Sequence, residues 1–374
     1  MQRVPPWQIP FAFFATSIAT LGAALLWAAI APPPAFVLLH LLVLGVFATT
    51  AMGALYQFVP VVGMAPLRFS RLPYAHLALA IAGTALVAYG FDVTNLQIVL
   101  LGGALHTAGA ILELTVLLAT LRGSKNAGMP SRLATAAFAW LLATFAAGMA
   151  VAHGTLAPGV HGIIGLAGFF GTLITAVTFR LLKMFERVNV ETRAPLRAIF
   201  VTVSALVTVF WPHVGAILLA IAAAIFVADL FVIAAKRNPA YQRETLFYSL
   251  ISGFGGLFAA AGAAFGYWYE AIVLAVWFFT GCAVAGYIQR IVPFIWWIRR
   301  SHAESPKNVP LLEQLTSPRL GVSIVLLWSA AGLWWFFAPF TRGPAIVALC
   351  AYAALLAQLS RIHLNADRIV KASN

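Results

Sequence analysis

Histidines within apolar sequence are the first sign of chemistry in this chain. Five of its eight histidines lie inside or at the ends of long apolar stretches: His40, His106, His153, His161 and His213. Neutral imidazole is a common ligand of copper and iron, so several imidazoles at one depth on separate rigid helices could hold a metal ion or a heme. A lone membrane histidine can also simply hydrogen-bond a neighbouring helix, and this alternative stays open for each.

Three further side chains could act with these histidines. Met149 precedes His153 by four residues, hence on the same helix face, and a thioether beside an imidazole suits Cu(I) or a low-spin heme. Glu113 follows His106 by seven residues, two turns along one face. Glu113 and Asp229 are acids within apolar sequence, where each is a candidate proton or ion relay, although a structural pairing is the alternative for Asp229.

The elements that must position these groups are membrane-spanning helices. The chain is 62% hydrophobic and 9% charged, whereas soluble domains carry about 25% charged residues. A hydrocarbon core about 30 Å thick needs roughly 20 apolar residues per helix. On that measure the sequence predicts an all-α polytopic membrane protein, a single transmembrane domain over 1–374 with contact to the lipid bilayer. Its twelve spans are 9–31, 35–61, 73–91, 95–121, 132–153, 157–183, 195–211, 214–235, 246–266, 270–298, 319–339 and 343–364.

Charge sorting predicts the orientation. Of the 23 Lys and Arg residues, all but Arg342 fall toward the chain ends or alternate connections, among them Lys125, Arg187, Arg237, Arg243 and Lys307. Short cytoplasmic loops retain such residues, so both termini are expected in the cytoplasm of a bacterium or archaeon, with the protein in the cytoplasmic membrane. The net charge of +13 then reflects topology rather than nucleic-acid binding. His76, His302 and His363 fall at cytoplasmic ends and are expected at the interface.

The twelve spans also divide into three sets of four, with candidate repeats at 1–125, 126–240 and 241–374. The segments 53–60 and 286–293 align without a gap in the second span of the first and third sets. His40 and His161 occupy matching places in the second spans of the first two sets, and Val273 stands there in the third. Recurrence at matching places makes His40 and His161 the favoured ligands.

These features resemble the heme–copper oxidase subunit I superfamily and its NnrS-like branch. The likeness rests on twelve spans without large loops, on His40 in helix two and on His161 in helix six. It implies heme b and copper as cofactors, with His40 at a heme-ligand position and His161 at a copper-ligand position. Helix seven lacks the family's His-His pair and the span 270–298 has no histidine. The complete oxidase centre is therefore not expected, nor is a functional terminal oxidase.

The sequence thus favours a heme- or copper-binding membrane protein, in sensing of nitric oxide or oxygen or in electron transfer, with a redox partner or membrane subunit. His40 and His161 would be the principal ligands, and the rest of the sphere would come from His106, Met149, His153 or His213. The alternative is a metal-free, proton- or ion-coupled secondary transporter that uses Glu113 and Asp229. A transporter predicts broken helices around a midplane cavity, and a heme protein predicts straight helices. Glycines of helices two and six would either pack closely or make room for a macrocycle: Gly45, Gly53, Gly165, Gly168 and Gly171.

Overall fold

The computed structural model describes residues 5–124, 128–185, 193–236, 244–303, 312–339 and 341–373. All regular elements within these residues are helices: α1 (Gln8–Ile30), α2 (Ala35–His40), η1 (Leu41–Ala48), α3 (Thr49–Gly63), α4 (Leu72–Asp92), α5 (Leu96–Arg122), α6 (Met129–Ala152), α7 (Pro158–Ile163), η2 (Ile164–Gly171), α8 (Thr172–Phe185), α9 (Ala194–Phe210), α10 (Pro212–Lys236), α11 (Glu244–Ala264), α12 (Trp268–Leu274), η3 (Ala275–Thr280), α13 (Gly281–Ala303), α14 (Leu312–Leu315), α15 (Pro318–Phe337) and α16 (Arg342–Ser373).

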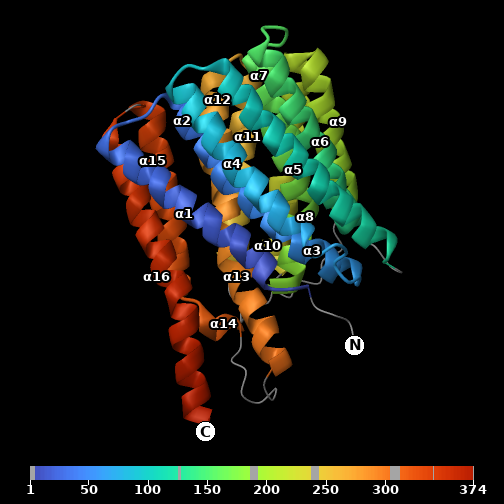
Figure 1. The fold of residues 1–374 in the computed structure, drawn as a ribbon, viewed down its shortest axis with the longest axis vertical. Coiled ribbons are helices and arrows are strands. Elements are labelled where there is room, and N and C mark those ends of the chain that lie inside the picture. Colours follow the sequence, from blue (N-terminus) through green and yellow to red (C-terminus); the bar gives the residue numbers. More distant parts are fainter. Residues whose placement is uncertain are drawn as a thin grey trace.

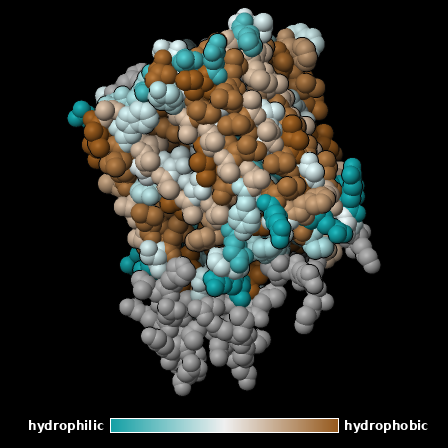
Figure 2. All heavy atoms as spheres, viewed as in Figure 1, coloured by the Kyte–Doolittle hydropathy of each residue, from teal (hydrophilic) through white to brown (hydrophobic). Residues whose placement is uncertain are grey.

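The described helices confirm an all-α polytopic membrane protein. Eleven spans in this part of the chain are long and apolar enough to cross a bilayer, and α9 adds a shorter apolar helix. Three of the eleven are composite: α2, η1 and α3 form one span, as do α7, η2 and α8, and α12, η3 and α13. On the face shown in Figure 2, hydrophobic residues cover the middle of the bundle, and hydrophilic ones gather toward its ends. This is the surface that contact with lipid requires.

The bundle has two chemically different ends. Both termini lie at the lower end of Figure 1, and α2, α7 and α12 begin at the upper end. We call the end that carries both termini the basic end and the opposite one the distal end. Arg68 and Arg71 follow α3 at the basic end, as predicted. Some predicted basic residues lie outside the described part of the chain: Lys125, Arg187, Arg237, Arg243 and Lys307.

Three spans form the interior of the bundle. In their most apolar stretches, 61% of Ala35–Gly63, 78% of Pro158–Phe185 and 61% of Trp268–Arg299 is buried, against 33–44% for the other described spans. These are the second spans of the three predicted sets. The side chains most shielded from lipid are therefore those of these three interior spans. His40 and His161 belong to the first two of them.

Each interior span changes from α to π-helical hydrogen bonding at a similar place. η1, η2 and η3 each follow a short α-helix that begins at the distal end. π-helical turns are rare and often lie at functional sites. Their recurrence supports the threefold repeat, which stays a prediction. It also means that these spans are neither the straight helices expected for a heme protein nor helices broken by Gly or Pro.

Two helices run past their predicted ends. α13 continues to Ala303 and α16 to Ser373, whereas the hydropathy pattern placed these ends at residues 298 and 364. Apolar length measures only the part of a helix inside the hydrocarbon, and the backbone hydrogen-bond ladder can continue into water. These extensions lie at the basic end.

Candidate functional site

His40 and His161 lie opposite one another in the distal half of the bundle. Their ring centroids are 6.4 Å apart and their planes differ by 13°. His40 is the last residue of α2, directly before η1, and His161 lies in α7, three residues before η2. Both side chains are partly buried. The structure therefore brings together the two histidines that the repeat pattern favoured.

Both imidazoles are held in the same tautomer. Nδ1 of His40 donates to the carbonyl oxygen of Phe36 at 2.7 Å, and Nδ1 of His161 donates to that of Thr144, on α6, at 3.0 Å. A carbonyl can only accept, so each Nδ1 carries the proton and each Nε2 of the neutral ring keeps its lone pair. Metal-binding histidines are commonly oriented in this way, by a hydrogen bond from the other ring nitrogen to a backbone carbonyl.

The separation of the two rings suits one metal ion between them. A centroid distance of 6.4 Å with near-parallel planes occurs in offset-stacked ring pairs, and it is also compatible with two imidazoles that share one ion. Two imidazoles on opposite sides of one ion have centroids about 6.4 Å apart, because each metal–nitrogen bond is about 2.0–2.1 Å and each nitrogen lies about 1.2 Å from its ring centre. Nitrogen donors of this kind suit copper, iron, zinc or nickel.

The glycines of the spans Ala35–Gly63 and Pro158–Phe185 do not form a cradle for a heme. A Cβ added at Gly45 would lie 2.6 Å from the Thr20 methyl carbon, and one added at Gly168 would lie 2.6 Å from the Trp140 ring. At Gly165 it would lie 3.1 Å from the Thr144 methyl carbon. Side chains of neighbouring helices already fill these faces, so the glycines serve close packing. These glycines therefore leave no flat space for a macrocycle against their faces.

The other predicted ligands lie apart from this pair or at its margin. Met149 is partly exposed near the distal end of α6, and His153 is exposed just after that helix. His213 is exposed at the start of α10, where its Nδ1 donates to the Ala264 carbonyl oxygen at 3.1 Å. Within the described ranges, no group of three or more His, Cys, Asp or Glu side chains is placed to hold a metal ion. Ligation beyond His40 and His161 stays a prediction.

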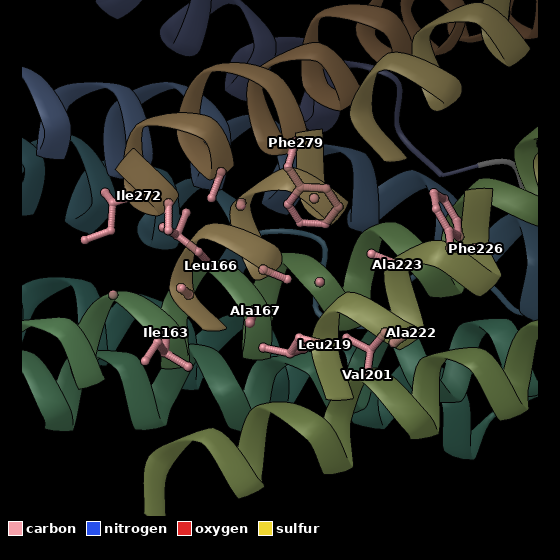
Figure 3. A pocket seen from close by; sticks show the side chains of 18 of the residues that line it. Ile163, Leu166, Ala167, Val201, Leu219, Ala222, Ala223, Phe226, Ile272 and Phe279 are labelled. Carbon is pink, nitrogen blue, oxygen red and sulfur yellow. The ribbon is translucent and has the colours of Figure 1, made fainter. Parts of the chain in front are cut away.

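An apolar cavity of about 120 Å³ lies on the other face of α7 and η2. Figure 3 shows Ile163, Leu166 and Phe279 among its lining side chains. Neither His40 nor His161 lines it, and most of its surface is aliphatic or aromatic. This cavity therefore does not extend the histidine pair into a larger polar site.

A second polar group lies between α4 and α5. The Thr84 hydroxyl is 3.1 Å from Nε2 of His106, which is buried, as expected for a mid-membrane histidine. Nearer the basic end, Nδ1 of His76 is 3.0 Å from the Tyr56 hydroxyl and 3.5 Å from Oε2 of Glu113.

The sequence did not predict that His76 is buried within the protein, and its predicted position at the membrane interface stays a prediction. His76 is only 1% exposed and packs between α3 and α5, in the closely apposed α4–α5 pair. The hydropathy pattern missed it because it places a residue by depth along a helix and not by the face that the residue occupies. His302 lies in the final turn of α13, and the backbone of His363 continues α16.

Asp229 differs from Glu113 in having a cationic partner. Its Oδ2 accepts from Nε of Arg197 at 2.7 Å, and its Oδ1 accepts from Nη2 of the same residue at 3.3 Å. Glu113 is fully buried, and neither of its carboxyl oxygens has a hydrogen-bond partner. The structural pairing considered for Asp229 is therefore present. Glu113 has no such pairing with Lys or Arg among the described residues, so it is the better of the two candidates for a proton relay.

The chain matches no protein-family model, and no curated protein is similar to it. The resemblance to heme–copper oxidase subunit I therefore rests on the residues of helices two and six and on the number of spans.

Proposed function

We propose that this membrane protein binds one metal ion, copper as Cu(I), between His40 and His161. The observation that carries the proposal is the pair of near-parallel imidazoles 6.4 Å apart, each with Nδ1 donating to a backbone carbonyl. This arrangement presents two neutral nitrogen donors on separate interior helices, at a separation that one ion spans.

Copper suits this position better than the common alternatives. Zinc sites in proteins are usually four-coordinate, and magnesium or calcium requires oxygen ligands. Two imidazoles with partly buried, apolar surroundings favour a softer ion that accepts few ligands. Met149 could approach as a further soft ligand from the distal end of α6. The charge sorting favours a position of this site toward the outer surface of a bacterial or archaeal cytoplasmic membrane, where a copper ion would bind a diatomic gas or exchange an electron with a partner.

The proposal is tested by copper stoichiometry in the full-length protein. The purified protein in detergent is loaded with Cu(I) under reducing conditions, desalted and subjected to elemental analysis. We expect about one copper per chain, and less than about a tenth of that in His40→Gln or His161→Gln, because two-coordinate binding cannot survive the loss of either ligand.

His213→Gln is the matched control. Like His40 and His161, His213 lies near the distal end and donates from Nδ1 to a backbone carbonyl. It lies beside Ala264 and Trp268 instead of beside a second histidine. Equal copper loss in this variant, or no copper in the wild type, would refute the proposal. A stoichiometric heme Soret band would show instead that the glycine faces open to accept a macrocycle.

A metal-free, proton-coupled transporter is the second candidate, and Glu113 is the observation that favours it. A buried carboxyl without hydrogen-bond partners is typical of groups that change protonation during transport. The cavity of about 120 Å³ is apolar, however, and the carboxylate of Asp229 is paired with Arg197. The copper measurement separates the two candidates, because a metal-free transporter retains no stoichiometric copper.

A further inference from the structure

The α4–α5 pair carries histidines at two levels, each set against a glycine of the other helix. A Cβ at Gly83 of α4 would lie 2.7 Å from Cδ2 of His106, on α5. Reciprocally, a Cβ at Gly109 of α5 would lie 2.8 Å from Cδ2 of His76, on α4. Only glycine allows such close approach, so the two helices hold both imidazoles at their interface.

The lower level brings three titratable groups together. The Tyr56 hydroxyl comes from α3, the His76 imidazole from α4 and the Glu113 carboxyl from α5. All three are buried. α6 also packs on α5, but its one titratable residue is Arg132, in its first turn; α1, which packs on α3, has none. Among the ion pairs within 4.0 Å that the described residues form, Glu113 takes part in one, with Nδ1 of His76 at 3.5 Å.

The surroundings of Glu113 favour the protonated carboxylic acid. An ionised carboxylate buried without hydrogen bonds or a cation is strongly destabilising. Both oxygens of Glu113 lack hydrogen-bond partners, and the nearest titratable nitrogen is Nδ1 of His76, at 3.5 Å. In the neutral tautomer with the hydrogen on Nε2, Nδ1 of His76 accepts one hydrogen bond, from the Tyr56 hydroxyl.

The two nitrogens of His76 lie toward two different groups. Nδ1 lies beside Tyr56 and Glu113, whereas Nε2 is 3.5 Å from the position of a Cβ on Gly109, between Glu113 and His106 along α5. At the upper level, Nδ1 of His106 is buried and has no hydrogen-bond partner. An imidazole that lies beside a protonated carboxyl can accept a proton at one nitrogen and exchange the proton at the other, so His76 can mediate the exchange of the Glu113 proton.

We propose that Glu113, His76 and Tyr56 form a proton-binding site between α3, α4 and α5, in which His76 takes up and returns the proton of Glu113. In the first step the Glu113 O–H bond breaks and a proton moves to Nδ1 of His76, leaving a carboxylate beside an imidazolium. The Tyr56 hydroxyl then accepts a hydrogen bond from Nδ1 instead of donating one. The return of a proton from Nδ1 to the carboxylate restores Glu113 and allows the Tyr56 hydroxyl to donate to Nδ1 again.

This proposal does not depend on a metal at His40 and His161, and its test uses the full chain without added metal. Infrared spectra of the protein in lipid nanodiscs at neutral pH report the carbonyl stretch of protonated carboxyl groups. The chain has only ten Asp and Glu residues, so one buried carboxylic acid is resolvable. We expect a band that is lost in Glu113→Gln and that shifts after exchange into D₂O.

Asp229→Asn is the matched control, because Asp229 also lies within a span but is paired with Arg197. This change is expected to leave the band intact. A band unaffected by Glu113→Gln, or one that never shifts in D₂O, overturns the proposal; the D₂O measurement needs no variant and so is independent of folding defects.

A kinetic readout separates proton transfer from a structural role. His76→Asn preserves a hydrogen-bonding group near Tyr56 but cannot carry a proton through a ring. We expect the band to remain while its exchange in D₂O slows at least tenfold, and His76→Gln should behave in the same way. Exchange at the wild-type rate in both variants would refute the role of His76 as the relay.

Discussion

The close contact between α4 and α5 predicts opposite effects of one substitution at two adjacent glycines. Gly102→Ala places a methyl group against α4, where its Cβ would lie 2.7 Å from the Gly83 carbonyl oxygen and 2.8 Å from the Val87 backbone nitrogen. Gly103→Ala, one residue further along α5, places the same methyl group where no atom lies within 4 Å. The two variants have the same amino-acid composition. They differ only in the face of α5 that carries the new methyl group.

The structure sets the size of the difference. Ordinary Cβ contacts begin at 3.4 Å, so Gly102→Ala must separate the backbones of α4 and α5 locally by roughly 0.7 Å. Overpacking of this kind costs about 1–3 kcal/mol. Both variants gain the same helix propensity, about 0.5–1 kcal/mol, so this gain cancels in the comparison. We expect Gly102→Ala to be less stable than Gly103→Ala by about 1–3 kcal/mol.

The assay is unfolding by sodium dodecyl sulfate in mixed micelles, followed by tryptophan fluorescence. The two variants are compared at equal protein concentration, and unfolding rates replace free energies if refolding is incomplete. If Gly102→Ala unfolds within about 0.5 kcal/mol of Gly103→Ala, α4 and α5 are not packed as described. The positions of His76 and His106 at their interface would then also be in question.

Three further predictions concern other parts of the molecule. Gly148→Ala would place a Cβ 3.1 Å from Cε1 of His161, so displacement of the ring should lower Cu(I) affinity about tenfold in a competition titration; unchanged affinity would count against the site. Trp328→Phe removes an N–H that donates to a carbonyl oxygen of η3 at 2.7 Å, and should destabilise the protein by about 1–2 kcal/mol in detergent unfolding, unless that carbonyl finds another donor. A double-mutant cycle on Arg197 and Asp229 should give a coupling energy below about 1 kcal/mol, since their side chains are 28% and 24% exposed; a larger value would show a more buried pair.

The spans could be predicted from sequence because the bilayer imposes a fixed length and a fixed cost on charge. Apolar run length and the sorting of Lys and Arg are direct consequences of that solvent. The π-helical segments could not be predicted in this way, since Leu41–Ala48 is as apolar as an α-helical span. Hydropathy is insensitive to which carbonyl accepts each backbone hydrogen bond.

The candidate metal site was partly predictable. His40 and His161 share a place in two of the predicted sets of four spans, and proteins with internal repeats bring such places near one another. The distance between the rings and their tautomers depend on Phe36 and Thr144 carbonyl oxygens. Those contacts depend on helix rotation and tertiary packing, which cannot be predicted from the spacing of the histidines in the sequence.

His76 was missed although a signal for it is present in the sequence. The turn at Thr94 and Asn95 makes α4 and α5 antiparallel. His76 lies eighteen residues before Thr94, and Glu113 lies eighteen residues after Asn95. Equal distances from a tight turn place two residues at one level of a helical hairpin. The same rule pairs the next level, where Gly83 and His106 are each eleven residues from the turn.

The π-helical segment η1 also sets the rotational phase of its span. Sixteen residues separate His40 from Tyr56, and an uninterrupted α-helix would leave their side chains about 160° apart, on opposite faces. A π-helix has about 4.4 residues per turn, so eight π-helical residues rotate roughly 140° less than eight α-helical residues. The side chains of His40 and Tyr56 therefore lie on nearly the same face of the span. His40 accordingly contacts Phe91 and Tyr56 contacts His76, both on α4. A single span thus presents an imidazole near one membrane surface and a phenol near the other to the same neighbouring helix.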